Sequence, residues 1–60
     1  MKVYEVFYYN SYSQTLLREE ICVPDDFIIE NVDSLKSLFY NKIPSGSYIF
    51  DFHFLGLRVF

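Results

Sequence analysis

The sequence is poor in the residues that usually stabilise a very small domain or carry out chemistry. Its 60 residues include one cysteine, one histidine, two glycines and no tryptophan. A single cysteine excludes a disulfide within the chain, and Cys22 and His53 supply too few ligands for a Cys/His zinc site. Gly46 and Gly56 lie too far apart to form a glycine-rich loop that cradles a phosphate. We therefore expect neither a metal nor a cofactor.

Basic residues and long apolar runs are also scarce. Five basic and eight acidic residues give a net charge of -3, whereas domains that bind nucleic acid through its phosphates are normally basic. We therefore expect no direct binding to DNA or RNA. No apolar run approaches the roughly 20 residues of a membrane span, and residues 1–10 lack the apolar block of a signal peptide. The sequence predicts a cytoplasmic protein without membrane contact, and an unpaired cysteine suits that reducing compartment.

Aromatic side chains, in contrast, are abundant. Seven phenylalanines and six tyrosines are more aromatic surface than such a small core can hide. A chain of this length buries only about 60% of its unfolded surface, so its core is marginal. Without a disulfide or a metal, we expect a homodimer that hides part of this surface at a subunit interface.

The hydrophobic pattern predicts one domain, residues 1–60, of the α+β class with the order β-β-α-β. We expect an antiparallel sheet with one helix packed on it and dimerisation through the sheet. The first strand is apolar on both faces, so a helix could cover one face and a second subunit the other. The plainer interpretation is that the tyrosine hydroxyls of this strand lie at the rim of one ordinary core. The predicted elements are strands at 2–9 and 15–23, a helix at 32–42 and a strand at 47–60.

The two N-terminal strands are separated by a short polar turn, which predicts an antiparallel hairpin. The second strand alternates, with Ile21 and Val23 on one face and Leu16 and Arg18 on the other. Pro24 ends this strand because it lacks the backbone donor that a sheet requires.

The helix is predicted from apolar residues at three- and four-residue intervals. Asn31 or Asp33 can cap its N-terminus, and we expect it to end near Asn41 or Lys42, before Pro44. A helix this short is unstable alone, so it must pack on the sheet. The apolar stripe consists of Val32, Leu35, Leu38 and Phe39.

The last strand has an aromatic residue at every second position, which predicts one buried face. These residues are Tyr48, Phe50, Phe52 and Phe54. A bulge or bend is expected near Gly56, where the apolar phase changes. We expect the second half of the strand to contact the twin subunit. The predicted dimer interface consists of Phe52, Phe54 and Leu57.

Five of the eight carboxylates fall between Glu20 and Asp33. An acidic edge beside apolar helix residues could meet a basic, DNA-binding surface. The plainer interpretation is solvated loop carboxylates, some of which cap the helix. For catalysis, Cys22 and His53 could form a thiolate–imidazole pair, but no third orienting group supports it. We therefore predict that the protein is not an enzyme.

The segment 32–41, preceded by an aromatic-rich hairpin and followed by a strand, resembles the short phage-encoded inhibitors of uracil-DNA glycosylase. The resemblance covers the order of elements along nearly the whole chain and individual residues only in this helix. It implies an acidic homodimer that mimics DNA. Two helices and the joined sheets would form a cleft for the enzyme's minor-groove leucine, and carboxylates would replace phosphates.

By position, the family's phenylalanine, leucine and tyrosine would fall on Leu35, Leu38 and Phe39. Asn41 matches the family's asparagine, whereas Lys36 stands where the family has a glutamate and reverses its charge. A slip of one residue would instead make Tyr40 the counterpart of the tyrosine. The strand glutamate that helps the family bind would be Glu19 or Glu20. The predicted partner-binding residues are Glu19, Glu20, Leu35, Leu38, Phe39 and Tyr40.

Two other classes of function compete with this hypothesis. A small phage or mobile-element protein could bind another host protein through exposed aromatics or an edge strand. A minimal enzyme using Cys22 and His53 is the third possibility and has the least support in the sequence.

Overall fold

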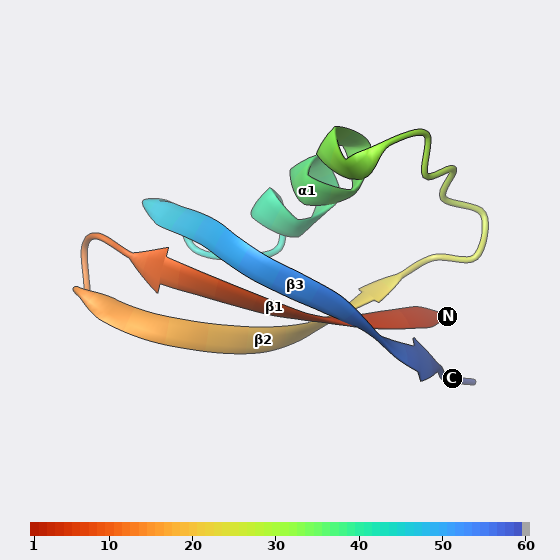
Figure 1. Cartoon of the computed structure of the whole chain (residues 1–60), viewed down its shortest axis with the longest axis horizontal. Coiled ribbons are helices and arrows are strands. Elements are labelled where there is room, and N and C mark those ends of the chain that lie inside the picture. Colours follow the sequence, from red (N-terminus) through yellow and green to blue (C-terminus); the bar gives the residue numbers. More distant parts are fainter. Residues whose placement is uncertain (60) are drawn as a thin grey trace.

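The computed structural model describes residues 1–59, which form a three-stranded antiparallel sheet with one helix on one face (Figure 1). The predicted α+β class and β-β-α-β order are confirmed. The strand order is β2-β1-β3, so β1 is central and the other two strands are edges. Within the described residues, no helix has the length and apolar character needed to cross a membrane. The elements are β1 (Lys2–Asn10), β2 (Thr15–Val23), α1 (Val32–Tyr40) and β3 (Ser47–Leu57).

The element boundaries lie close to those predicted. β2 has the predicted bounds, and β1 extends one residue further, to Asn10. α1 ends at Tyr40 with Asn41 as its C-cap, slightly before the predicted end. β3 ends at Leu57, and Phe60, which the predicted last strand included, lies outside the described residues.

A buried asparagine holds the turn between β1 and β2. The Asn10 side chain is 4% exposed, and its Oδ1 accepts the backbone N–H groups of Tyr12 and Ser13, each at 3.0 Å. Its Nδ2 donates to the carbonyl oxygen of Ser45 at 3.1 Å and to Oγ of Ser47 at 3.0 Å. One amide therefore ties the hairpin turn to the loop that precedes β3.

Local signals also define the start of α1. Pro24 ends β2, and its carbonyl oxygen accepts the N–H of Phe27 at 3.1 Å in the predicted turn. Oδ1 of Asn31 accepts the N–H of Ser34 at 2.9 Å, and the Ser34 hydroxyl donates to the Asn31 carbonyl at 2.8 Å. Of the two predicted caps, Asn31 therefore occupies the N-cap position, in a capping box.

Two side chains of α1 hold it on the sheet. Leu35 is 5% exposed and Phe39 is fully buried. The Phe39 ring centroid lies 5.5 Å from that of Tyr4 and 5.3 Å from that of Phe52. A nine-residue helix is unstable in water by itself, so this packing keeps it folded. The remaining core residues are Val6, Tyr8, Ile21, Val23, Ile43 and Ile49.

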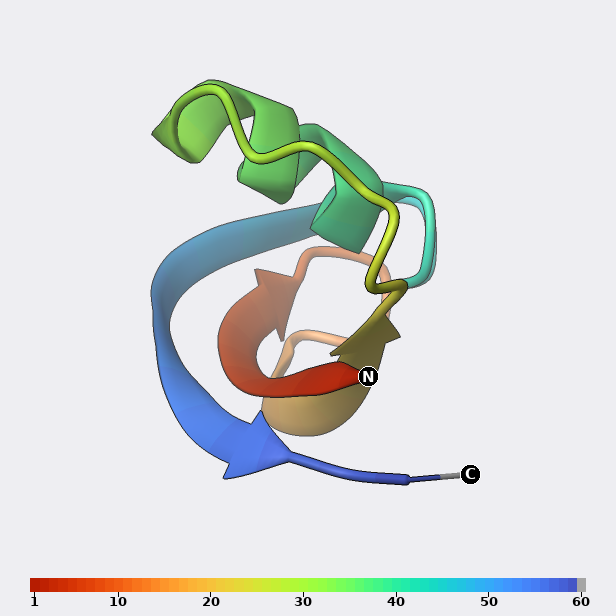
Figure 2. The same cartoon turned by 90° about the vertical axis from the view of Figure 1, so that its right-hand side faces the viewer.

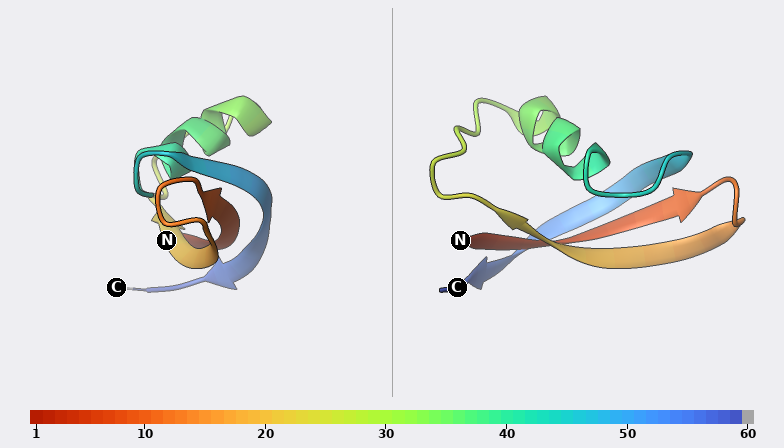
Figure 3. Two further views of the ribbon diagram at one scale, coloured as in Figure 1. Left: turned by 90° about the vertical axis from the view of Figure 1, so that its left-hand side faces the viewer. Right: turned by 180° about the vertical axis from the view of Figure 1, so that it is seen from behind.

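The helix covers only one face of the sheet. Figures 1 and 3 place α1 on one side of the three strands, with no other element of the described chain on the opposite side. The end-on view in Figure 2 shows that the sheet is strongly coiled. Strand side chains alternate between the two sides, and we call the side opposite α1 the helix-free face. Its side chains from β1 and β2 are Val3, Glu5, Phe7, Tyr9, Leu16, Arg18, Glu20 and Cys22.

The aromatic side chains of β3 do not all lie on one face of the sheet, which corrects the prediction of a single aromatic face. The register of β3 against β1 shifts between Phe7, which pairs with Asp51, and Tyr8, which pairs with Ile49. Phe50 is therefore an extra residue without a partner on β1. Ile49 is consequently in the core. The Phe50 ring instead lies beside Phe7 on the helix-free face, with 6.4 Å between ring centroids. The prediction is wrong here because a β-bulge shifts the residues that follow it to the opposite phase.

A second irregularity occurs where the sequence predicts it. The register shifts again between Val3 and Tyr4, whose partners are Gly56 and Phe54. Gly56 has a φ of 152°, a conformation that favours glycine. The bulge near Gly56 is therefore confirmed.

We expect Phe39→Ala to lower the free energy of unfolding by about 3–5 kcal/mol, because it removes a buried ring and leaves a cavity. Urea unfolding followed by circular dichroism measures this change. Val32→Ala, at a helix position that is 57% exposed, is the control and should change stability by less than about 0.5 kcal/mol. Equal losses in the two variants would contradict the assignment of Phe39 to the core.

We expect Asn10→Ala to lower the free energy of unfolding by about 1–3 kcal/mol, because part-buried backbone groups of both loops lose their hydrogen-bond partner. The same urea titration measures it. Asn41→Ala, at an exposed asparagine, is the matched control, with an expected change below about 0.5 kcal/mol. A loss no larger than that of the control would show that the Asn10 amide does not hold the two loops together.

Candidate functional site

The segment between β2 and α1 is the most acidic part of the chain. Residues 25–33, called the acidic segment here, contain four carboxylates and no basic residue. Figure 1 shows this segment rising on the helix side of the sheet. Ile28 lies within it and is 76% exposed. The four carboxylates are all exposed and belong to Asp25, Asp26, Glu30 and Asp33.

The acidic segment has little internal charge compensation. Oδ1 of Asp25 lies 3.3 Å from the amino group of Met1. Among the described residues, the other three carboxylates of the segment form no ion pair. Val32, at the first helical position beside Asp33, is 57% exposed. The segment therefore presents negative charge around exposed aliphatic side chains, which suits a basic partner with an apolar protrusion.

Two of the four helix residues predicted to bind a partner are buried. Leu35 and Phe39 belong to the core, and this burial corrects the expectation that a partner contacts them directly. Leu38 is half-buried and packs against the same core. Tyr40 is 40% exposed, and its hydroxyl oxygen accepts the N–H of Ile49 at 3.0 Å. Of these four residues, Tyr40 presents the most surface.

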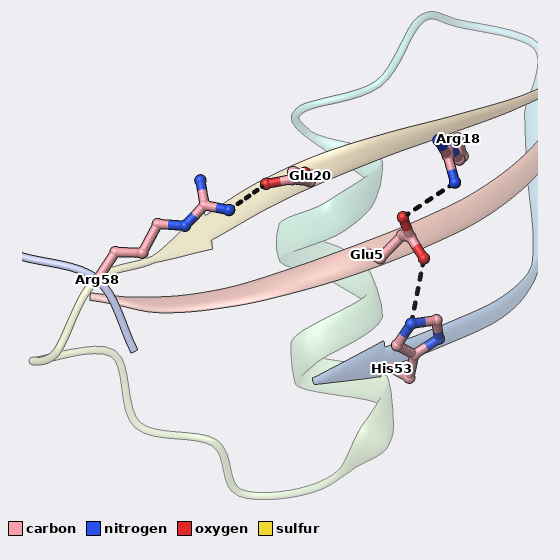
Figure 4. Close-up of polar contacts among 5 residues, drawn as sticks. All are labelled: Glu5, Arg18, Glu20, His53 and Arg58. Atoms are coloured by element: carbon pink, nitrogen blue, oxygen red, sulfur yellow. Dashed lines mark ion pairs between the residues drawn. The ribbon is translucent and has the colours of Figure 1, made fainter. Parts of the chain in front are cut away.

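The two candidate glutamates of β2 lie on opposite sides of the sheet. Glu19 pairs with Val6, a core residue, so it lies on the side of α1. Glu20 pairs with Glu5 on the helix-free face, and its Oε1 lies 2.8 Å from Nη2 of Arg58 (Figure 4). Only Glu19 therefore shares a side with the acidic segment.

Glu19 also accepts a hydrogen bond from a buried tyrosine and raises the pKa of that tyrosine. The Tyr8 hydroxyl donates to Oε2 of Glu19 at 3.4 Å, and Tyr8 is 4% exposed. Burial, followed by the charge of Glu19 and the hydrogen bond to it, raises the pKa of Tyr8 above its ordinary value. The folded chain consequently holds the Tyr8 proton more tightly than the unfolded chain does.

A second surface lies at the hairpin end of the helix-free face. It contains a hollow of about 240 Å³ with an almost entirely apolar lining. Leu16 is 70% exposed and Phe50 is 54% exposed, so both side chains present apolar surface to solvent. The lining residues are Phe7, Leu16, Leu17, Arg18 and Phe50.

Beside the hollow, one glutamate lies between two basic side chains. Figure 4 shows Glu5 on β1 between Arg18 and His53, with α1 behind the sheet. Oε2 of Glu5 is 3.5 Å from Nη1 of Arg18, and Oε1 is 3.1 Å from Nε2 of His53. No sequence pattern predicts this cluster, because its members come from three strands and meet only through the sheet register.

The possible catalytic pair is not brought together. Cys22 lies on β2 opposite Val3, whereas His53 lies on β3 opposite Glu5. The central strand separates the two side chains, and the contact of His53 is with Glu5. In residues 1–59, no group of three or more metal-binding side chains is present.

The three predicted dimer residues differ in their exposure. Phe52 is half-buried and packs under α1 against Phe39, so only part of its side chain is accessible to another subunit. Phe54 contacts Tyr4, with 5.4 Å between ring centroids, but is 51% exposed. Leu57 is 74% exposed. Phe54 and Leu57 therefore remain accessible to another chain.

Comparisons of the chain with known protein families, with curated proteins and with solved structures find no match. Two surfaces of the chain itself have the exposed charge or apolar area typical of binding sites. These are the acidic segment beside α1 and the apolar hollow on the helix-free face.

We expect the free energy of unfolding to fall as the pH rises above about 10. The unfolded chain loses the Tyr8 proton near that pH, whereas the folded chain keeps it until its own higher pKa is reached. Urea unfolding between about pH 8 and pH 11 measures the slope. Tyr8→Phe should make the slope shallower, and Tyr12→Phe, at a residue that is 80% exposed, should leave it unchanged. Equal slopes for wild type and Tyr8→Phe would contradict the assignment.

Proposed function

We propose that the chain is a non-enzymatic DNA mimic that inhibits uracil-DNA glycosylase by occupying its DNA-binding site. The observation that carries this proposal is the acidic segment, in which four exposed carboxylates flank the exposed Ile28 in sequence. Glu19 adds another carboxylate on the same side of the sheet. A net charge of -3 in a 60-residue chain favours a basic partner over nucleic acid.

In this mechanism, carboxylates take the positions that phosphates occupy on DNA. Attraction between the acidic segment and a basic groove would speed association and make binding sensitive to salt. The apolar contact with the enzyme's minor-groove leucine would come from Ile28, Val32 and Tyr40, which are all exposed. These residues replace Leu35 and Phe39, which α1 uses to hold the sheet.

The same proposal assigns no chemistry to the chain. Cys22 and His53 lie on the two outer strands with β1 between them, which supports a binding role over a catalytic one.

We expect micromolar amounts of the protein to inhibit uracil excision by a purified bacterial glycosylase and to co-elute with the enzyme in size-exclusion chromatography. Glu30→Gln should weaken inhibition about threefold to tenfold, because it removes a charge from the acidic segment. Asp51→Asn removes an equal charge from β3 and should have little effect. The absence of both inhibition and complex at micromolar concentration would refute the proposal.

A second candidate is an interaction module for another host protein, supported by the outer edge of β3. Along the first half of this edge, side chains bind two outward N–H groups: the Tyr40 hydroxyl binds Ile49, and Oδ1 of Asp51 accepts Phe52 N–H at 2.9 Å. Beyond Phe52, the described chain shows no such capping, and Phe54 and Leu57 are exposed. An open edge of this kind can receive a strand from a partner.

These two functions can be distinguished by what binds the protein in a bacterial lysate. Glycosylase in the bound fraction, lost with Glu30→Gln, supports the inhibitor. A different protein in that fraction, lost with Leu57→Lys but kept with Glu30→Gln, supports the interaction module.

A further inference from the structure

The hairpin end of the helix-free face is unusually apolar for a sheet surface that no element of the described chain covers. Antiparallel sheets that have one solvated face normally place polar residues there. Here Leu16, Phe50 and Tyr9 are 70%, 54% and 39% exposed, and two of them border the hollow beside Phe7. Exposed apolar surface of this kind on a small protein usually marks a binding site.

Two of the three carboxylates on this face are paired with arginines, and the third, Asp51, lies opposite Phe7 and accepts the N–H of Phe52. Glu5 pairs with Arg18 and Glu20 pairs with Arg58, so the chain's two arginines are both paired with glutamates. The acidic segment, by contrast, lies on the other side of the sheet with α1 (Figure 1). Two copies of a chain with a net charge of -3 repel each other less on this face, where most charges are paired, than on the side of the acidic segment.

We infer that a second copy of this chain packs on the helix-free face. In a twofold-symmetric contact, the same patch serves both copies. Phe50 of each copy then enters the hollow beside Phe7 of the other, where the lining is apolar. The result is a helix–sheet–sheet–helix stack, in which both acidic segments remain on the outside and free to bind a partner.

A second copy fits this face better than an unrelated partner of either charge. Because both glutamates of this face are paired with arginines, Asp51 is its one carboxylate without an ion pair among the described residues, which is little charge to attract a strongly basic protein. A copy of the chain brings an equally apolar surface on which most charges are paired. It also enlarges the buried core, which a 60-residue domain without disulfide or metal needs. This inference does not depend on the proposed inhibition of a glycosylase.

The test is sedimentation equilibrium of the wild-type protein and its variants over a range of micromolar concentrations. We expect the wild type to reach twice the 7.2 kDa mass of one chain. Leu16→Glu and Phe50→Glu should each raise the dissociation constant by about a hundredfold or more, because each would bury an unpaired charge. Leu57→Glu, at the open end of β3, is the matched control and should leave the dimer intact.

Circular dichroism establishes that each variant is folded, and Leu16→Glu decides the result if Phe50→Glu disturbs the bulge. A wild type that stays monomeric, or dimers that survive Leu16→Glu but not Leu57→Glu, would overturn the inference. The second result would mean that copies pair along the edge of β3. A monomer that still inhibits the glycosylase would refute this inference alone, and a dimer that does not inhibit would refute only the proposed function.

Discussion

The structure depends on one constraint, which is that a single nine-residue helix must cover a sheet that is apolar on both faces. Leu35 and Phe39 are buried between α1 and the sheet, and this packing keeps α1 folded. With one helix in the described chain, only one face can be covered. The other face keeps an exposed leucine and an exposed phenylalanine beside a hollow of about 240 Å³.

This constraint divides the molecule into two chemically different sides. The side with α1 carries the acidic segment, where charge is concentrated and little compensated. On the helix-free face, the arginines neutralise the neighbouring glutamates. A basic partner on the first side and a second copy on the other could bind together, because neither surface includes residues of the other.

The sequence was sufficient for features whose cause is local. Alternation in β2, the capping box at Asn31 and the bend near Gly56 depend on neighbouring residues, and all three are present. The bulge at Phe50 and the cluster around Glu5 depend on register between strands, which periodicity in one strand does not reveal. The resemblance assigned partner-binding roles to Leu35 and Phe39, but these residues are buried. The residues of an apolar helix stripe are the ones that pack on the sheet, so sequence alone does not separate binding residues from core residues.

The most direct test of this account is an isotope-filtered nuclear Overhauser experiment on a mixture of labelled and unlabelled protein, which detects only contacts between different copies. The account predicts contacts from the Phe50 ring of one copy to Phe7 and Leu16 of the other, and none from Ile28 in the acidic segment. Contacts confined to Phe54 and Leu57, or the absence of any contact between copies, would contradict it.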